Sequence, residues 1–239
     1  MIESLESTGM VLLGTAAALA VFHALVGVDH SLPFVVLARA RGWTLRRTLA
    51  ITTLCGLGHV ASSVLIGGLG AAAGLTLDSL VWVEGARGEL AAVLLISFGL
   101  TYAAWAGWRR LRAQPHSHLH AHADGTVHNH RHEHAGEHVH PHETGPGLTP
   151  WALFLIFVFG PCEPLIPLMV VPAMAGTWAM LAAVIAVFSV LTVGTMVAAV
   201  SLGYYGLHRL GSGVLEHHGD VLAGLAIAAS GGAVLFLGL

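Results

Sequence analysis

The chain repeatedly forms apolar runs that are long enough to cross a lipid bilayer. These runs cover residues 8–38, 47–75, 88–107, 149–173, 177–207 and 220–239. A helix needs about 20 apolar residues to span the hydrocarbon core, where each backbone polar group must be paired within the protein. Only 10% of the residues are charged and the mean hydropathy is +0.76, whereas about 25% are charged in soluble domains. The sequence therefore predicts an all-α integral membrane protein with six transmembrane helices.

The basic residues indicate how these helices are oriented. All ten are arginines, and nine of them follow the first, third or fifth predicted span or lie in the long loop after the third. Cytoplasmic loops carry such an excess of Arg and Lys, so both termini should face outside. On this interpretation the outer side carries Arg87 and the acidic residues Glu3, Glu6, Asp78, Glu84 and Glu89. We expect a bacterial inner (cytoplasmic) membrane protein, and the net charge of −3 gives no reason to expect a nucleic-acid partner.

The two halves of the chain resemble each other. Segment 27–33 matches segment 160–167 with one inserted residue, and the later matches in the same order are Gly58/Gly194, Gly67/Gly203, Ser97/Ser230 and Gly99/Gly232. Three spans in each half make the halves cross the membrane in opposite directions. We therefore expect two inverted three-helix repeats, residues 1–113 and 149–239, joined by a histidine-rich cytoplasmic loop, residues 114–148.

Helix-breaking residues lie inside the matched segments. They are Gly27, Pro33, Pro161, Pro164 and Pro167. Proline lacks a backbone N–H, and a broken helix inside a membrane is tolerated only where it is buried in protein or lines a cavity. Transporters with inverted repeats place their substrate sites at such breaks, near the midplane of the bilayer. The sequence therefore predicts broken helices that meet at a central site.

Titratable side chains lie within the first apolar run. His23 and His30 are seven residues apart and share one face of a helix, with Asp29 beside them. Ionisable residues inside a membrane are costly and usually functional, and imidazole with carboxylate suits divalent transition metals. The alternative is a polar cluster that only joins helices through hydrogen bonds.

Three residues elsewhere extend this candidate site. His59 lies in the middle of the second span, and Cys162 and Glu163 lie within the second matched segment. Glu163 is the only carboxylate within the fourth and fifth predicted spans. The alternatives are an interhelical hydrogen bond for His59 and an inert buried thiol for Cys162. Metal ligation is therefore predicted for His23, Asp29, His30, His59, Cys162 and Glu163.

The loop between the halves is a second metal-binding candidate. It holds eleven of the seventeen histidines: His116, His118, His120, His122, His128, His130, His132, His134, His138, His140 and His142. Its composition cannot build a core, so we expect it to be disordered without a ligand. Histidine-rich tracts bind Ni²⁺, Co²⁺, Cu²⁺ and Zn²⁺, and the alternative is a merely solvated spacer.

These motifs resemble those of a known family. The His23–Asp29–His30 pattern, with Gly-Leu-Gly-His ending at His59, is similar to the nickel/cobalt transporter superfamily, especially its efflux and urease-accessory permease branches. The resemblance implies that these four residues bind or support the metal, although this chain has one extra residue between His23 and Asp29. The segment around Cys162 resembles, more weakly, the Pro-Cys motifs of membrane thiol-disulfide carriers related to cytochrome c biogenesis.

Two functional hypotheses follow. The first is a transporter of a divalent transition metal, Ni²⁺ or Co²⁺ before Zn²⁺, that works by alternating access, with a cytoplasmic metallochaperone as a candidate partner. The second is a transmembrane redox carrier that uses Cys55 and Cys162, which requires the two thiols to meet. No nucleophile elbow, phosphate loop or HExxH helix occurs, so an enzyme is not expected.

Overall fold

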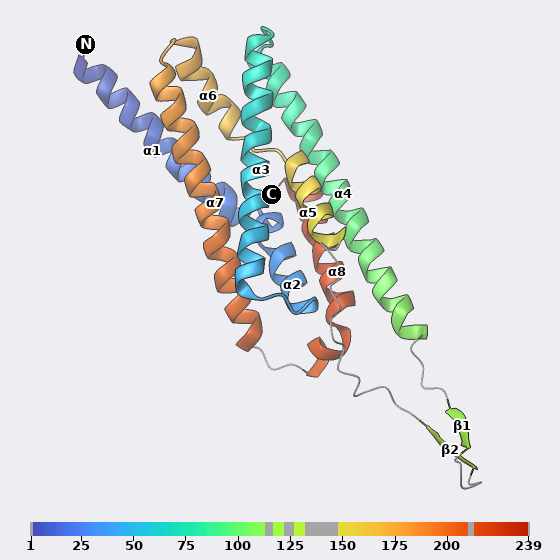
Figure 1. Ribbon diagram of the computed structural model, residues 1–239. Coiled ribbons are helices and arrows are strands. Elements are labelled where there is room, and N and C mark those ends of the chain that lie inside the picture. Colours follow the sequence, from blue (N-terminus) through green and yellow to red (C-terminus); the bar gives the residue numbers. More distant parts are fainter. Residues whose placement is uncertain (1, 113–116, 122–126, 132–147, 210–212, 239) are drawn as a thin grey trace.

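The computed structural model describes residues 2–112, 117–121, 127–131, 148–209 and 213–238 (Figure 1). These residues are almost wholly helical. In chain order they form α1 (Ile2–Val26), the 3-10 turn η1 (Val28–His30), α2 (Leu32–Ala40), α3 (Leu45–Ala72), α4 (Leu77–Arg112), the strands β1 (Ser117–Ala121) and β2 (Val127–Arg131), α5 (Leu148–Phe159), α6 (Leu165–Met174), α7 (Trp178–Arg209) and α8 (Gly213–Leu237).

Among the described residues, five helices have the length and apolar composition needed to cross a membrane. These stretches are Ser7–Val26, Leu45–Gly70, Leu77–Arg112, Trp178–Leu207 and His218–Leu237. The prediction of a helical membrane protein is confirmed at this level. The span expected at 149–173 is divided into two shorter apolar helices, α5 and α6, because the chain breaks between Phe159 and Leu165.

A similar break interrupts the first predicted span. Gly27 ends α1 with an extended backbone, η1 makes one tight turn, and Pro33 lies in the first turn of α2, where its missing N–H costs nothing. A Cβ atom at residue 27 would collide with the imidazole of His30. Glycine is therefore needed at this position for the chain to turn and bring His30 into the interior.

Helices from the two halves of the chain pack closely against each other. α1 lies along α7, α5 lies along α3, and the largest contact is between α4 and α8 (Figure 1). Gly99 of α4 and Gly224 of α8 face each other so closely that a Cβ atom on either would meet the backbone of the other helix. Small residues permit this approach, which is typical of membrane helices.

The buried apolar side chains form two clusters, which we name for their places in Figure 1. The upper cluster includes Ala20, Val60 and Phe188, together with Ala16, Cys162, Leu165, Leu168, Met169 and Val184. The lower cluster includes Ala24, Cys55 and Met196, together with Phe34, Leu37, Trp43, Leu95, Tyr102, Phe157, Val200 and Ile227. His23 on α1 and His59 on α3 lie between residues of the upper cluster and residues of the lower cluster.

Residues 117–121 and 127–131 of the loop between the halves form a short antiparallel hairpin, where the sequence predicts disorder. β1 pairs with β2 so that His118 lies opposite His130 and His120 opposite His128. In Figure 1 the hairpin lies apart from the helices. The other loop histidines, His116, His122, His132, His134, His138, His140 and His142, lie outside the described residues.

Candidate metal centre

Three histidines from different parts of the chain converge in the interior. His23 comes from the last turn of α1, His30 from η1 and His59 from the middle of α3. Each offers a ring nitrogen, and these nitrogens all lie within 4.8 Å of one another. His30 and His59 are buried, and His23 is half-buried. The break after α1 creates this group, because η1 turns His30 toward α3.

The ring positions fit coordination of one ion. The Nε2 atoms of His30 and His59 are 3.4 Å apart. Two ligands at about 2.0–2.1 Å from a tetrahedral ion are separated by about 3.4 Å. The ring of His23 lies 4.6 Å from that of His30 and 5.9 Å from that of His59, measured between centroids. The three rings therefore surround one small volume.

The other nitrogens of His30 and His59 are held by partners of the kind found around bound metals. Nδ1 of His30 lies 3.0 Å from Oδ1 of Asp29, and Nδ1 of His59 lies 3.3 Å from the carbonyl oxygen of Phe157. A carboxylate or carbonyl in this position selects the tautomer with Nδ1–H and leaves Nε2 free to bind an ion. Asp29 thus contacts His30 and orients it.

A small cavity adjoins Asp29 and His59. Its volume is about 20 Å³, and its lining includes Asp29, His59, Gly88 and Gly160. Glu163 does not join the histidine group: its residue is exposed, and its carboxylate lies near Gly88, where a Cβ atom would come within 3.7 Å of Oε1. Glu163 thus lies outside the group of three histidines and beside the cavity wall, and its convergence with them around a bound ion stays a prediction.

Cys162 is also separate from the histidine group. It is fully buried in the upper cluster, and its backbone N–H donates to Ser63 Oγ at 3.0 Å and to Glu84 Oε2 at 3.1 Å. Cys55 is buried in the lower cluster, and neither cysteine is in a disulfide. The two thiols thus lie in different parts of the core.

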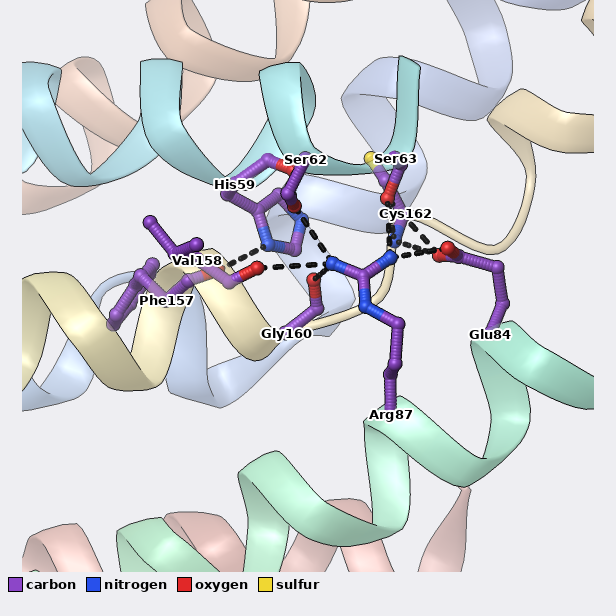
Figure 2. Close-up of polar contacts among 9 residues, drawn as sticks. All are labelled: His59, Ser62, Ser63, Glu84, Arg87, Phe157, Val158, Gly160 and Cys162. Carbon is purple, nitrogen blue, oxygen red and sulfur yellow. Dashed lines mark hydrogen bonds and ion pairs between the residues drawn. The ribbon is translucent and has the colours of Figure 1, made fainter. Parts of the chain in front are cut away.

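The structure also reveals an ion pair next to this site, between two residues that the sequence predicts on the outer side (Figure 2). Glu84 is 1% exposed and pairs with Arg87 one turn later on α4. The Arg87 guanidinium donates to Ser62 Oγ at 2.7 Å and to the Val158 and Gly160 carbonyls at 2.9 and 3.2 Å. Glu84 accepts from Ser63 Oγ at 3.0 Å.

This ion pair explains how the break between α5 and α6 is tolerated. The carbonyls at the end of α5 have no partner within their helix, and Arg87 supplies one with a positive charge. Glu84 accepts the N–H of Cys162 just before α6. Opposite charges thus stabilise the two ends of the break between α5 and α6. Helix α3 contacts this break through Ser63, and it contacts the break after α1 through His59.

The fold and the site define a helical protein whose described residues include five helices long and apolar enough to cross a membrane, with a group of three histidines in its interior beside an ion pair. Comparison with known proteins gives no matching family model, no matching curated protein and no matching solved structure. Membership of the nickel/cobalt transporter superfamily therefore stays a prediction from the motifs around His23 and His59.

Proposed function

We propose that the protein transports divalent transition-metal ions across a membrane, with Ni²⁺ or Co²⁺ as substrate. The observation that carries this proposal is the convergence of His23, His30 and His59 inside a bundle of apolar helices. Neutral imidazole is a preferred ligand of nickel, cobalt and zinc, and ionisable groups inside a membrane mark ion pathways. The ion is the substrate, and it binds at the level where α1 and α5 both end.

Alternating access requires a site that each side can reach in turn, and the helix packing supports such a plan. If α1 to α4 correspond to α5 to α8, the contact of α1 with α7 has its counterpart in that of α5 with α3. Under the same correspondence α3 matches α7 and α4 matches α8, so the contacts of α3 with α7 and of α4 with α8 each join two equivalent helices. This pairwise pattern supports two inverted repeats with broken helices at the centre, which move relative to each other around the ion.

Protons are the coupling ion that we propose for transport. Imidazole binds metal only when neutral, so binding releases or excludes protons. When a metal ion leaves the site on one side of the membrane, His30 or His59 can take up a proton there. When the site opens to the other side, the next metal ion displaces this proton, so the proton crosses the membrane in the opposite direction to the metal. The gradient of protons thus drives metal movement, and its direction sets the direction of transport.

The redox alternative has less support in the geometry. A thiol-disulfide carrier needs Cys55 and Cys162 to approach within about 7 Å between Cα atoms. The two residues belong to different core clusters, and the three histidines have no role in such a carrier. The metal hypothesis uses the residues that the fold brings together.

Reconstituted vesicles test the proposed function. Purified protein in liposomes with a trapped metal-sensitive dye should move Ni²⁺ or Co²⁺ when a pH gradient is imposed. His30→Ala and His59→Ala should each abolish the signal. His218→Ala is a suitable control because this histidine is exposed near the start of α8. Transport at the wild-type rate in His30→Ala or His59→Ala would exclude the site.

A further inference from the structure

Two buried polar atoms lack a hydrogen-bond partner among the residues that the structure describes. They are Nε2 of His23 and Oγ1 of Thr192. Thr192 is 0% exposed, whereas Thr52 of α3, which is equally buried, donates its hydroxyl to the Thr48 carbonyl at 2.9 Å. Leaving a hydroxyl unpaired in an apolar interior is costly. A buried hydroxyl without a partner therefore suggests a ligand that the structure does not contain.

Thr192 lies between the two apolar clusters, as the histidines do. On α7, Phe188 belongs to the upper cluster and Met196 to the lower cluster, and Thr192 is one turn from each. His23 occupies the same interval on α1, between Ala20 and Ala24.

The same division holds on α3. Cys55 belongs to the lower cluster and Val60 to the upper cluster, with His59 between them. The two clusters are therefore separated by one polar layer, which α1, α3 and α7 each supply with a side chain.

The register of α3 against α7 places Thr192 at the height of the histidines. A Cβ atom at Gly56 would lie 3.1 Å from Met196 Sδ and 3.2 Å from Val193 Cγ2. The two helices run in opposite directions, so moving from Gly56 toward His59 on α3 corresponds to moving from Met196 toward Thr192 on α7 (Figure 1). The side of α7 that carries Thr192 is fully buried at Val184, Phe188, Met196 and Val200 as well.

We propose that Thr192 is a fourth group of the metal site and that its hydroxyl holds a water molecule bound to the ion. Three imidazoles leave one position of a tetrahedral ion for water. That water is a hydrogen-bond donor, and the Thr192 oxygen accepts from it, while the ion itself satisfies His23. One hydrated ion thus provides partners for both unpaired atoms. This inference rests on the proposed function, since it names a further residue of the same site.

The site should therefore favour an ion that binds three imidazole nitrogens and one water molecule. Removal of a group that positions a metal ligand typically weakens metal binding by about 10- to 100-fold. Thr192→Val keeps the shape of the side chain and removes the hydroxyl, whereas Thr192→Ser keeps the hydroxyl. Thr52→Val is the matched control, because it removes a buried hydroxyl that is already satisfied within its own helix.

The experiment measures Co²⁺ binding and the visible absorption spectrum of the Co²⁺ complex, with full-length protein in detergent. The difference between wild type and His59→Ala isolates the central site from the histidine-rich loop. We expect Thr192→Val to weaken binding at least about 10-fold and to change the spectrum. Thr192→Ser and Thr52→Val should keep the wild-type affinity and spectrum.

Thermal unfolding of the metal-free protein separates this role from a structural one. Thr192→Val removes an unpaired hydroxyl, so its melting temperature should equal or exceed that of wild type. A lower melting temperature, or wild-type Co²⁺ binding in Thr192→Val, would overturn the inference. If wild type itself shows no Co²⁺ complex that depends on His59, the proposed function fails instead.

Discussion

The guanidinium of Arg87 lies 2.9 Å from the carbonyl oxygen of Val158, in the last turn of α5. Seventy-one residues separate them in the chain, so α4 holds the end of a helix from the other half of the protein. The same turn of α5 supplies the Phe157 carbonyl that contacts His59. The ion pair and the candidate metal site therefore share one short segment of backbone. Movement of this segment would alter both.

Removing Arg87 should destabilise the protein strongly. Arg87→Met leaves Glu84 as an unpaired charge that is 1% exposed, and breaking a buried ion pair typically costs about 3–5 kcal/mol. The double variant Glu84→Gln/Arg87→Met should lose less stability, because no unpaired charge remains. Unfolding in detergent with increasing denaturant measures both free energies. Glu89→Gln, which changes an exposed carboxylate on the same helix, is the control. Equal stability of Arg87→Met and wild type would show that Glu84 does not need its partner.

Asp29 should affect metal affinity without being essential for binding. Its carboxylate accepts from Nδ1 of His30 and so presents Nε2 to the ion. Asp29→Asn keeps the size of the side chain and removes its charge, so the dissociation constant for Ni²⁺ should rise about 10- to 100-fold. His30→Ala should raise it further. Isothermal titration of the purified protein gives the values, and an unchanged constant in Asp29→Asn would remove Asp29 from the site.

Much of this architecture can be predicted from the sequence, because apolar runs, prolines and glycines act locally. The breaks after Val26 and Phe159 occur where Gly27 and the 161–167 prolines predict them. The group formed by His23, His30 and His59 also consists of residues that stand out in apolar runs. Which of them meet depends on packing between helices far apart in sequence.

The residues that sequence interpretation missed are hidden by their context. Two charges usually end a membrane span, so Glu84 and Arg87 resemble part of an outer segment, and the sequence predicts that the third span begins at Gly88. In the structure α4 begins at Leu77 and contains both residues, which pair with each other. Their spacing of three residues, which places them on one face of a helix, was the available signal. Thr192 gave no signal, because threonine is common in apolar helices.

Glu163 should influence transport and leave equilibrium binding intact. It lies outside the histidine group and beside Gly88, at the wall of the small cavity that adjoins His59. Glu163→Gln should therefore bind Ni²⁺ within about 2-fold of the wild-type affinity and transport it more slowly, since a carboxylate at the cavity attracts cations. Titration and vesicle flux on the same preparation separate the two quantities. A large loss of affinity would place Glu163 among the ligands.

Cys162 distinguishes the two hypotheses from the sequence. Its thiol is fully buried, and the contacts that position this residue are made by its backbone N–H. Cys162→Ser should therefore preserve Ni²⁺ transport, with a change in affinity or selectivity at most. A redox carrier would lose all activity in this variant. Cys55→Ser is the matched control, and transfer of reducing equivalents across vesicles by wild type, abolished in both variants, would favour the redox hypothesis.

The histidine-rich loop differs from the central site in its position and its backbone. The hairpin β1–β2 follows the arginine-rich end of α4 and extends away from the helices (Figure 1). In its backbone register His118 is paired with His130 and His120 with His128. Such interchangeable ligands suit capture of free metal better than a unique geometry does. We therefore expect the loop to adjust transport and not to perform it.

Deleting residues 116–142 should raise the metal concentration at which transport is half-maximal and leave the rate at saturating metal unchanged. Ordering a long polar segment costs conformational entropy that metal binding must offset, so each loop site should be modest in affinity. Histidine ordinarily has a pKa near 6.5, and protonated imidazole does not bind metal, so the wild-type protein should lose this advantage as the pH falls below about 6. Vesicle flux at pH 7.5 and pH 5.5, with wild type and the deletion, measures both effects. A deletion variant that inserts and folds but transports nothing at any metal concentration would place the loop in the transport pathway.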